Sequence, residues 1–188
     1  MFVYVLVAFV GRSYLVRKRT GINPVTFKGS DSAHDFVGRV FKLVFVLVVL
    51  VVFVYSFSPF AYTYTLPIQW LENSWLRSIG VLLLLLSLAW TSIAQSQMGE
   101  AWRIGIDTEH RTPLVQKGLF GISRNPIFVG MIFTLLGMFL TLPNALTLLA
   151  SVLGVVLIGV QVRLEEEYLA QVHPEAYRGY RQRVRRWL

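Results

Sequence analysis

The chain has 188 residues, of which 55% are hydrophobic and only 15% are charged, and its formal net charge is +8. A soluble domain carries about 25% charged residues, so this composition excludes an ordinary soluble domain and indicates an integral membrane protein. The sequence contains no cysteine, which excludes disulfides, thiolate catalysis and cysteine-bound metals.

Five apolar segments follow along the chain, and a helix that crosses a bilayer takes about 20 such residues. They cover residues 2–16, 40–57, 75–94, 126–142 and 145–162. The first is short, so we expect a short or tilted helix there. No small-residue cleavage site follows it, which argues against a signal peptide. The second is rich in β-branched residues, but its length favours a spanning helix over a strand.

A turn at Pro143 and Asn144 joins the last two segments into a helical hairpin. The charged segment beyond it, residues 163–188, is also predicted to be helical, and its arginines at helical spacing predict a basic face on the bilayer surface. The predicted fold is an all-α integral membrane protein with about five transmembrane helices, a C-terminal helical hairpin and a cytoplasmic amphipathic C-terminal helix. We divide it into three N-terminal spans, residues 1–94, and a region with a polar loop, the hairpin and the C-terminal helix, residues 95–188.

The basic residues indicate the orientation of the chain. If the N-terminus is outside, the loops at residues 11–42, 98–125 and 163–188 face the cytoplasm and hold 17 of the 18 Lys and Arg residues. This positive-inside pattern predicts a prokaryotic inner-membrane protein with a cytoplasmic C-terminus. Because the basic residues flank apolar segments, we interpret them as facing anionic lipid and expect no nucleic-acid partner. The three histidines are scattered, so we expect no metal site.

Small residues line one face of the segment 126–142, at Gly130, Thr134 and Gly137. Such a face lets a neighbouring helix approach closely. We expect that neighbour to be the last apolar segment, which carries Ala150 and Gly154.

The hairpin is expected to bring together two polar groups of residues. Arg124 and Asn125 precede the first helix, which Pro126 is well suited to begin, and Glu165 and Glu166 follow the second. Free N–H groups at the helix start, together with Arg124, suit a carboxylate or phosphate. The glutamates suit an ammonium group or ribose hydroxyls. The alternative interpretation is structural: a membrane-anchoring arginine and a solvated acidic helix with i, i+4 pairs.

A second polar cluster, QSQMGEAWRIGID at residues 95–107, lies ahead of the hairpin. Gln97, Trp102 and Arg103 give it an unusual composition for a plain loop, and Asp107 is placed to pair with a neighbouring arginine. The alternative is again structural, with Trp102 as a residue of the membrane interface.

The segments LVQKGLFGISRNPIFVG, EEEYL and HPEAYRGYRQRV stand in this order around the apolar hairpin. In order and spacing they resemble the isoprenylcysteine carboxyl methyltransferases, a family of membrane methyltransferases related to phospholipid N-methyltransferases. The resemblance covers roughly residues 95–188. It implies that this part is the cofactor-binding region and that the spans in residues 1–94 form the lipid or substrate side. The matching residues are Leu114, Val115, Gly118, Arg124, Pro126, Gly130, Glu165, Glu166, Leu169, Tyr177 and Tyr180.

The resemblance implies that the chain binds S-adenosylmethionine at the cytoplasmic membrane face. Its partner would be the bilayer and a lipophilic small molecule, lipid or lipidated substrate that arrives from it. The methionine carboxylate would lie near Arg124, the ammonium or ribose near Glu165 and Glu166, and adenine against Val115 and Phe120. The cofactor-binding residues expected on this basis are Val115, Gly118, Phe120, Arg124, Asn125, Pro126, Phe128, Gly130, Glu165 and Glu166.

Roles for the acceptor are assigned on the same basis. Gln97 and Trp102 are expected to contact the substrate, and Arg124 or Arg103 to orient an anionic acceptor. The sequence departs from the family pattern at several positions. Asn125 stands where histidine is usual, which removes one possible base, phenylalanines stand at positions 120 and 128 where tyrosine is usual, and His173-Pro174 stands where Phe-Gly is common.

A sulfonium cofactor is already activated, so the protein mainly supplies proximity and alignment, worth about 7–11 kcal/mol. A carboxylate acceptor needs no base, whereas a thiol or amine needs a proton acceptor, for which Glu165, Glu166 or a water is available. Two other functions stay open at this point. One is a nicotinamide-dependent membrane reductase related to sterol reductases, and the other is a non-catalytic membrane binding protein with the same fold.

Overall fold

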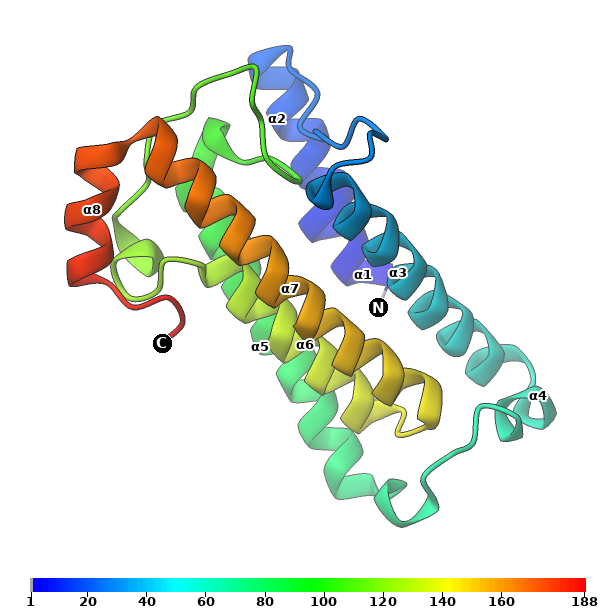
Figure 1. Ribbon diagram of the computed structural model, residues 1–188. Coiled ribbons are helices and arrows are strands. Elements are labelled where there is room, and N and C mark those ends of the chain that lie inside the picture. Colours follow the sequence, from blue (N-terminus) through cyan, green and yellow to red (C-terminus); the bar gives the residue numbers. More distant parts are fainter. Residues whose placement is uncertain (1) are drawn as a thin grey trace.

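The computed structural model describes residues 2–188, which fold into helices joined by loops, with isolated bridges but no strand in that range. Figure 1 shows the arrangement. The elements are α1 (Phe2–Val5), the π-helix η1 (Leu6–Gly11), α2 (Arg12–Thr20), α3 (Ala33–Phe57), α4 (Pro59–Thr63), η2 (Gln69–Leu71), α5 (Ser74–Met98), η3 (Gly99–Ala101), η4 (Gly118–Gly121), α6 (Pro126–Thr141), α7 (Ala145–Val172) and α8 (Pro174–Arg183).

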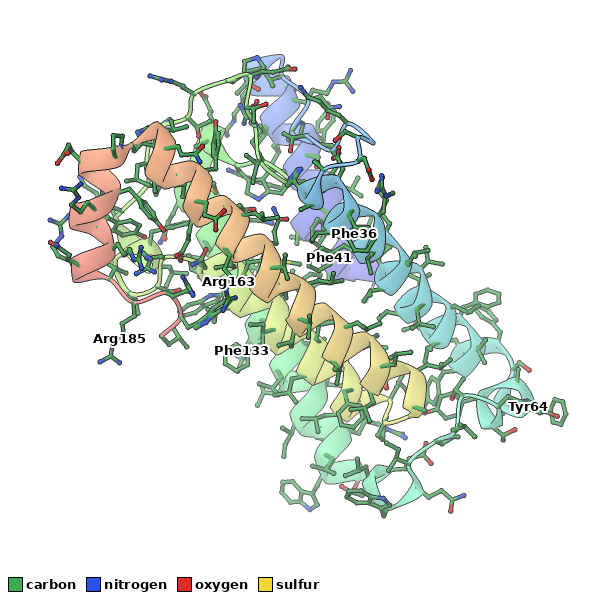
Figure 2. All side chains as sticks on the ribbon, viewed as in Figure 1. Phe36, Phe41, Tyr64, Phe133, Arg163 and Arg185 are labelled. Carbon is green, nitrogen blue, oxygen red and sulfur yellow. The ribbon has the colours of Figure 1, made fainter. Side chains whose placement is uncertain are left out.

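The helices α3, α5, α6 and α7 run side by side as a bundle (Figure 1). Three are long and apolar enough to cross a membrane, namely α3, α5 extended by η3, and α7, while α6 is apolar but has 16 residues. The outer surface carries large apolar side chains that are more than half exposed, such as Phe53, Leu85 and Val156, and in Figure 2 Phe133 and Tyr64 point away from the bundle. Such a continuous apolar surface requires lipid to cover it. The predicted class, an all-α membrane protein, is confirmed.

Polar caps fix where two of the long helices begin. The Ser32 hydroxyl accepts a hydrogen bond from the Asp35 N–H, so α3 begins at Ala33, seven residues before the apolar run at 40. Asn144 and Thr147 form a capping box at the start of α7. That helix then continues to Val172, because nothing interrupts it before Pro174. The charged segment predicted at 163–188 is therefore helical, but its first ten residues complete α7 and only Pro174–Arg183 forms a separate helix.

The small residues of α6 pack against α5. A Cβ on Gly130 would collide with the Thr91 hydroxyl, and a Cβ on Gly137 would lie 2.9 Å from the carbonyl oxygen of Gly80. The prediction that this face meets the last helix was wrong. Gly154 of α7 instead receives the Leu135 side chain of α6, so the hairpin packs through a different face from the one that the glycines mark.

The first helical segment, α1 to α2, lies beside the last turns of α5. The Tyr4 hydroxyl is 3.3 Å from the Thr91 hydroxyl, and the Gln95 side chain donates to the Ala8 carbonyl at 2.8 Å. Thr91 is two turns before the end of α5. Residues 2–16 therefore run past the end of α5 rather than along its whole length.

The charged loops gather at one end of the bundle, which we call the basic end (residues 17–32, 99–125 and 173–188). The Thr26 N–H donates to the Ile104 carbonyl at 3.1 Å, and the Arg124 N–H donates to the Arg185 carbonyl at 2.9 Å. The opposite end is closed by the hydrogen bond from Ala145 N–H to Thr65 carbonyl at 3.2 Å. The boundary predicted between residues 94 and 95 falls inside α5, and the division of function between the two halves stays a prediction.

Candidate functional site

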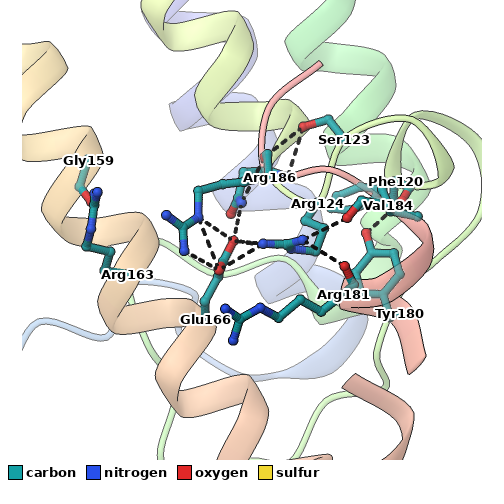
Figure 3. Close-up of polar contacts among 11 residues, drawn as sticks. Phe120, Ser123, Arg124, Gly159, Arg163, Glu166, Tyr180, Arg181, Val184 and Arg186 are labelled. Atoms are coloured by element: carbon teal, nitrogen blue, oxygen red, sulfur yellow. Dashed lines mark hydrogen bonds and ion pairs between the residues drawn. The ribbon is translucent and has the colours of Figure 1, made fainter. Parts of the chain in front are cut away.

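Glu166 lies at the centre of a polar network at the basic end (Figure 3). Its carboxylate accepts hydrogen bonds from the Arg124 guanidinium at 3.2 Å and from the Asn125 side-chain amide at 3.0 Å. Arg124 and Asn125 lie directly before α6, whereas Glu166 lies on α7. The side chains of Arg124 and Glu166 are only 7% and 8% exposed. The two walls expected to hold a ligand between them are therefore in direct contact in this structure.

A second arginine, Arg186, completes the network. Its guanidinium forms an ion pair with Glu166 at 3.0 Å, and its side chain is 32% exposed. Arg186 was not among the site residues predicted from the sequence. Six arginines lie between residues 163 and 188, and no spacing distinguishes Arg186 from the others. Its position depends on the chain folding back after α8, which leaves no local signal.

The chain after α8 folds back onto the start of α6. The Val184 carbonyl accepts from the Arg124 guanidinium at 2.7 Å, and the Arg186 carbonyl accepts from Asn125 and from the Ser123 hydroxyl, both at 3.2 Å. The Ser123 hydroxyl in turn accepts the Asn125 N–H at 3.1 Å. Residues 184–186, here called the return segment, thus satisfy donors that the sequence analysis assigned to a ligand.

Two tyrosines of α8 form one wall of the network. The Tyr180 hydroxyl donates to the Phe120 carbonyl at 2.6 Å and so fixes η4 against α8. Burial raises the pKa of Tyr180, and also of Tyr177, to about 12, and the Glu166 charge adds to the effect. Both phenols are therefore neutral at physiological pH. Within residues 2–188 the Tyr177 hydroxyl is buried without a hydrogen-bond partner, beside the charges of Arg124 and Glu166.

Glu165 faces away from this network. Its carboxylate accepts from the Gln161 side-chain amide at 2.9 Å, one turn earlier on α7. Consecutive helical residues point about 100° apart, so Glu165 and Glu166 point in different directions and have different partners in this structure. Two acceptors therefore lie together on this second face of α7, because the Gln161 side-chain oxygen is buried without a partner.

The predicted acceptor residues lie in the loop after α5. Arg103 donates to Asp107 at 2.9 Å and to the carbonyls of Glu100 and Trp102, and both charged side chains are less than a tenth exposed. Burial raises the pKa of Asp107, but donors from Arg103 and from two backbone N–H groups outweigh it, so the pKa lies below its ordinary value. Trp102 is 2% exposed. These contacts hold Arg103 within its own loop rather than in the Glu166 network.

The remaining predicted residues surround η4 and the start of α6. The Gln97 side-chain oxygen accepts the Leu119 N–H at 2.8 Å, and a Cβ on Gly118, whose φ is +65°, would collide with this amide. Phe120 is buried, Pro126 is the first residue of α6, and Gly130 contacts α5 as described. Val115 and Phe128 are half-buried. Their assignment to a cofactor stays a prediction.

A groove of about 490 Å³ lies between the end of α7 and α8. It is lined by Ala170, Pro174, Tyr177, Arg178, Arg181 and Gln182. Because the Tyr177 side chain contributes to both, the groove adjoins the Glu166 network. Within residues 2–188, no three histidine or acidic side chains lie together as metal ligands would.

Comparison with known proteins identifies one protein family. The family model described as phospholipid methyltransferase matches residues 75–176, just over half of the chain. The match extends from the start of α5 into α8 and includes Arg124, Asn125, Glu166 and the loop with Arg103. No curated protein and no solved structure matches the chain.

Proposed function

This chain belongs to the phospholipid methyltransferase family, and we propose that it transfers a methyl group from S-adenosylmethionine to a lipid or other membrane-associated acceptor. The family is related to the isoprenylcysteine carboxyl methyltransferases. The order of motifs from Leu114 to Tyr180 supports the closer assignment to an enzyme of that type. The acceptor class we favour carries a carboxylate, thiol or amine that enters from the bilayer.

The charge balance around Glu166 is the observation that carries the proposal. Two guanidinium groups, those of Arg124 and Arg186, share this one carboxylate. The cluster therefore carries one uncompensated positive charge, and charges buried in proteins are normally paired. A single anionic group would give one of the two guanidinium groups a partner of its own. The α-carboxylate of S-adenosylmethionine is such a group, and the arginine fork matches a carboxylate in shape.

The ammonium group of the same cofactor suits Glu166. When a ligand carboxylate binds one of the two guanidinium groups, Glu166 can accept hydrogen bonds from the ligand ammonium. One arginine–Glu166 ion pair is then replaced by two: the arginine with the ligand carboxylate, and Glu166 with the ligand ammonium. The free Tyr177 hydroxyl and the groove beside it suit the ribose, and Val115 and Phe120 suit the adenine. The bound cofactor would supply an electrophilic methyl group on a sulfonium centre.

The chain itself would supply alignment, exclusion of water and, where needed, a proton acceptor. The return segment and α8 cover the network from the solvent side, which keeps water from the reacting groups. An amine acceptor must lose a proton as its nitrogen forms the bond to the methyl carbon. Glu165 lies apart from every cation pair described above, so its carboxylate is the candidate to accept that proton.

The basic residues support an orientation of the chain in the membrane. We propose that the basic end faces the cytoplasm of a prokaryotic inner membrane, with the C-terminus inside. The supporting observation is that the loops of the basic end hold 13 of the 18 Lys and Arg residues and lie together at one end of the bundle. This end would attract anionic lipid headgroups, and the acceptor would reach the site from the side.

Calorimetric titration of the detergent-purified protein with S-adenosylhomocysteine tests the proposal. The wild type is expected to bind at micromolar concentration, and Arg124→Ala and Glu166→Ala are expected to lose that binding. Glu167→Ala is the matched control, because Glu167 neighbours Glu166 but is exposed. A folded wild type that binds NADPH but not S-adenosylhomocysteine would indicate a reductase, and one that binds neither would indicate a non-catalytic protein.

A further inference from the structure

Arg12 is half-buried, and its Nε atom is fully buried, which a membrane anchor does not need. The side of the first helical segment that faces α5 carries Tyr4, Ala8 and Val16, all buried, at intervals of four or eight residues. Arg12 continues this series, because it is four residues after Ala8 and four before Val16. By contrast, Arg17, Lys18 and Arg19 are exposed, as positive-inside anchors are.

The guanidinium of Arg12 has no carboxylate to balance it. Its Nη2 donates to the Gly99 carbonyl at 2.6 Å, and its Nε is buried without a partner in the described part of the chain. Among residues 2–188, no acidic side chain forms an ion pair with it. Capping the end of α5 uses one of five donors. A structural role alone therefore leaves a half-buried cation without a counter-charge and a buried Nε–H without an acceptor, which is costly.

The surrounding backbone is shaped around this residue. The π-helix η1 ends at Gly11, directly before Arg12, and the Ala8 carbonyl within η1 accepts the Gln95 side-chain amide. Single-turn π-helices are rare and occur often at functional sites. Gln95 and Gln97 lie on the same turn of α5, one toward η1 and the other toward η4. The segment that carries Arg12 and the loop that leads to α6 therefore both contact the last turns of α5.

We infer that Arg12 binds the phosphate of a membrane lipid, and that this lipid is the methyl acceptor or is held beside it. A phosphodiester supplies one negative charge and oxygens for the arginine fork. The outer face of the same helix presents exposed Val10, Tyr14 and Leu15, against which acyl chains can lie. Arg12 lies outside residues 75–176, the part that matches the family. That the bound lipid accepts the methyl group rests on the proposed function, but lipid binding by Arg12 can be measured separately.

The test measures lipid binding in neutral detergent micelles. The probe is phosphatidylethanolamine with a fluorescent acyl chain, and diacylglycerol with the same chain is the phosphate-free comparison. The wild type is expected to prefer the phospholipid, and Arg12→Gln is expected to weaken its binding about tenfold, as loss of a charge-assisted hydrogen-bond pair does. Arg12→Lys should retain part of the affinity. Arg17→Gln, which removes an exposed charge from the same helix, should bind like the wild type.

Three results would overturn the inference that Arg12 binds a lipid phosphate. Equal binding of both probes by the wild type would overturn the inference, even if Arg12→Gln fails to fold. Unchanged phospholipid binding by a folded Arg12→Gln would also overturn it. Displacement of the probe by millimolar inorganic phosphate would assign the site to free phosphate rather than lipid. S-adenosylhomocysteine binding should be the same in wild type and Arg12→Gln, so failure of the proposed function would appear there and not in the lipid measurement.

Discussion

Arg124 and Glu166 are 42 residues apart in the sequence, yet their side chains form a buried ion pair at 3.2 Å where α6 begins and α7 approaches its end. The hairpin turn at Asn144 places the two helices antiparallel, so residues about equally far from the turn meet. This pair links the packing of the hairpin to the chemistry of the site, and the first two predictions concern it.

Glu166→Gln is expected to destabilise the protein by about 3 kcal/mol, because it leaves two guanidinium groups without their common counter-charge. Thermal unfolding in detergent measures this effect. Glu167→Gln removes an exposed carboxylate from the next position and should change the midpoint little. If both variants unfolded at the wild-type temperature, the ion-pair network would contribute nothing to stability.

Arg186→Ala is expected to reduce the affinity for S-adenosylhomocysteine about five- to tenfold, because the cluster loses the guanidinium that gives it a net positive charge. Arg185→Ala is the control: its side chain is exposed and points outward in Figure 2, and only its carbonyl contacts Arg124. A higher affinity in Arg186→Ala would mean that this arginine competes with the ligand for Glu166.

Gly130→Ala is expected to destabilise the protein by about 1–3 kcal/mol, the usual cost of overpacking, because the added Cβ would collide with the Thr91 hydroxyl where α5 and α6 touch. Gly159→Ala provides the comparison, since the nearest atom to its new Cβ is the end of the flexible Arg163 side chain at 3.5 Å. There, the better helix propensity of alanine should leave stability unchanged or raise it. Equal unfolding temperatures would contradict the close approach at Gly130.

Asp107→Asn is expected to destabilise the loop after α5 in a pH-dependent way. The pKa of Asp107 is lower in the folded state than the ordinary 3.8, so its carboxylate stabilises the fold above that value. This contribution is lost as the pH falls through the folded pKa. Unfolding curves from pH 7.5 to pH 3 should show a constant gap between wild type and variant that narrows below about pH 4. A gap that widens toward low pH would contradict the assignment.

Much of the fold follows from local signals in the sequence. Apolar runs predicted the long helices, and Asn144 predicted the hairpin turn. The start of α3 was placed too late, because the cap at Ser32 lies before the apolar run. The neighbour of the α6 glycines was wrong because a small-residue face shows that a helix approaches closely but not which one. Only tertiary packing brings Gly80 of α5 to Gly137.

The candidate site was predictable in part, because some of its residues belong to local sequence motifs. Arg124, Asn125 and Glu166 belong to motifs with fixed spacing from the hairpin, and the structure brings them together. Glu165 is adjacent to Glu166 in the sequence, and only the continuation of α7 as one helix sends it to another face. Arg186 depends on the return of the chain after α8, a long-range event that no local pattern encodes.

The return segment also sets an order of events during biosynthesis. Residues 184–186 leave the ribosome after all the helices that surround Glu166, yet they supply Arg186 and the carbonyls that Arg124 and Asn125 contact. A nascent chain can therefore insert every membrane helix before its polar network is complete. The proposed ligand would bind only after residues 184–186 have been synthesised, so a partly synthesised chain in the membrane would not bind it.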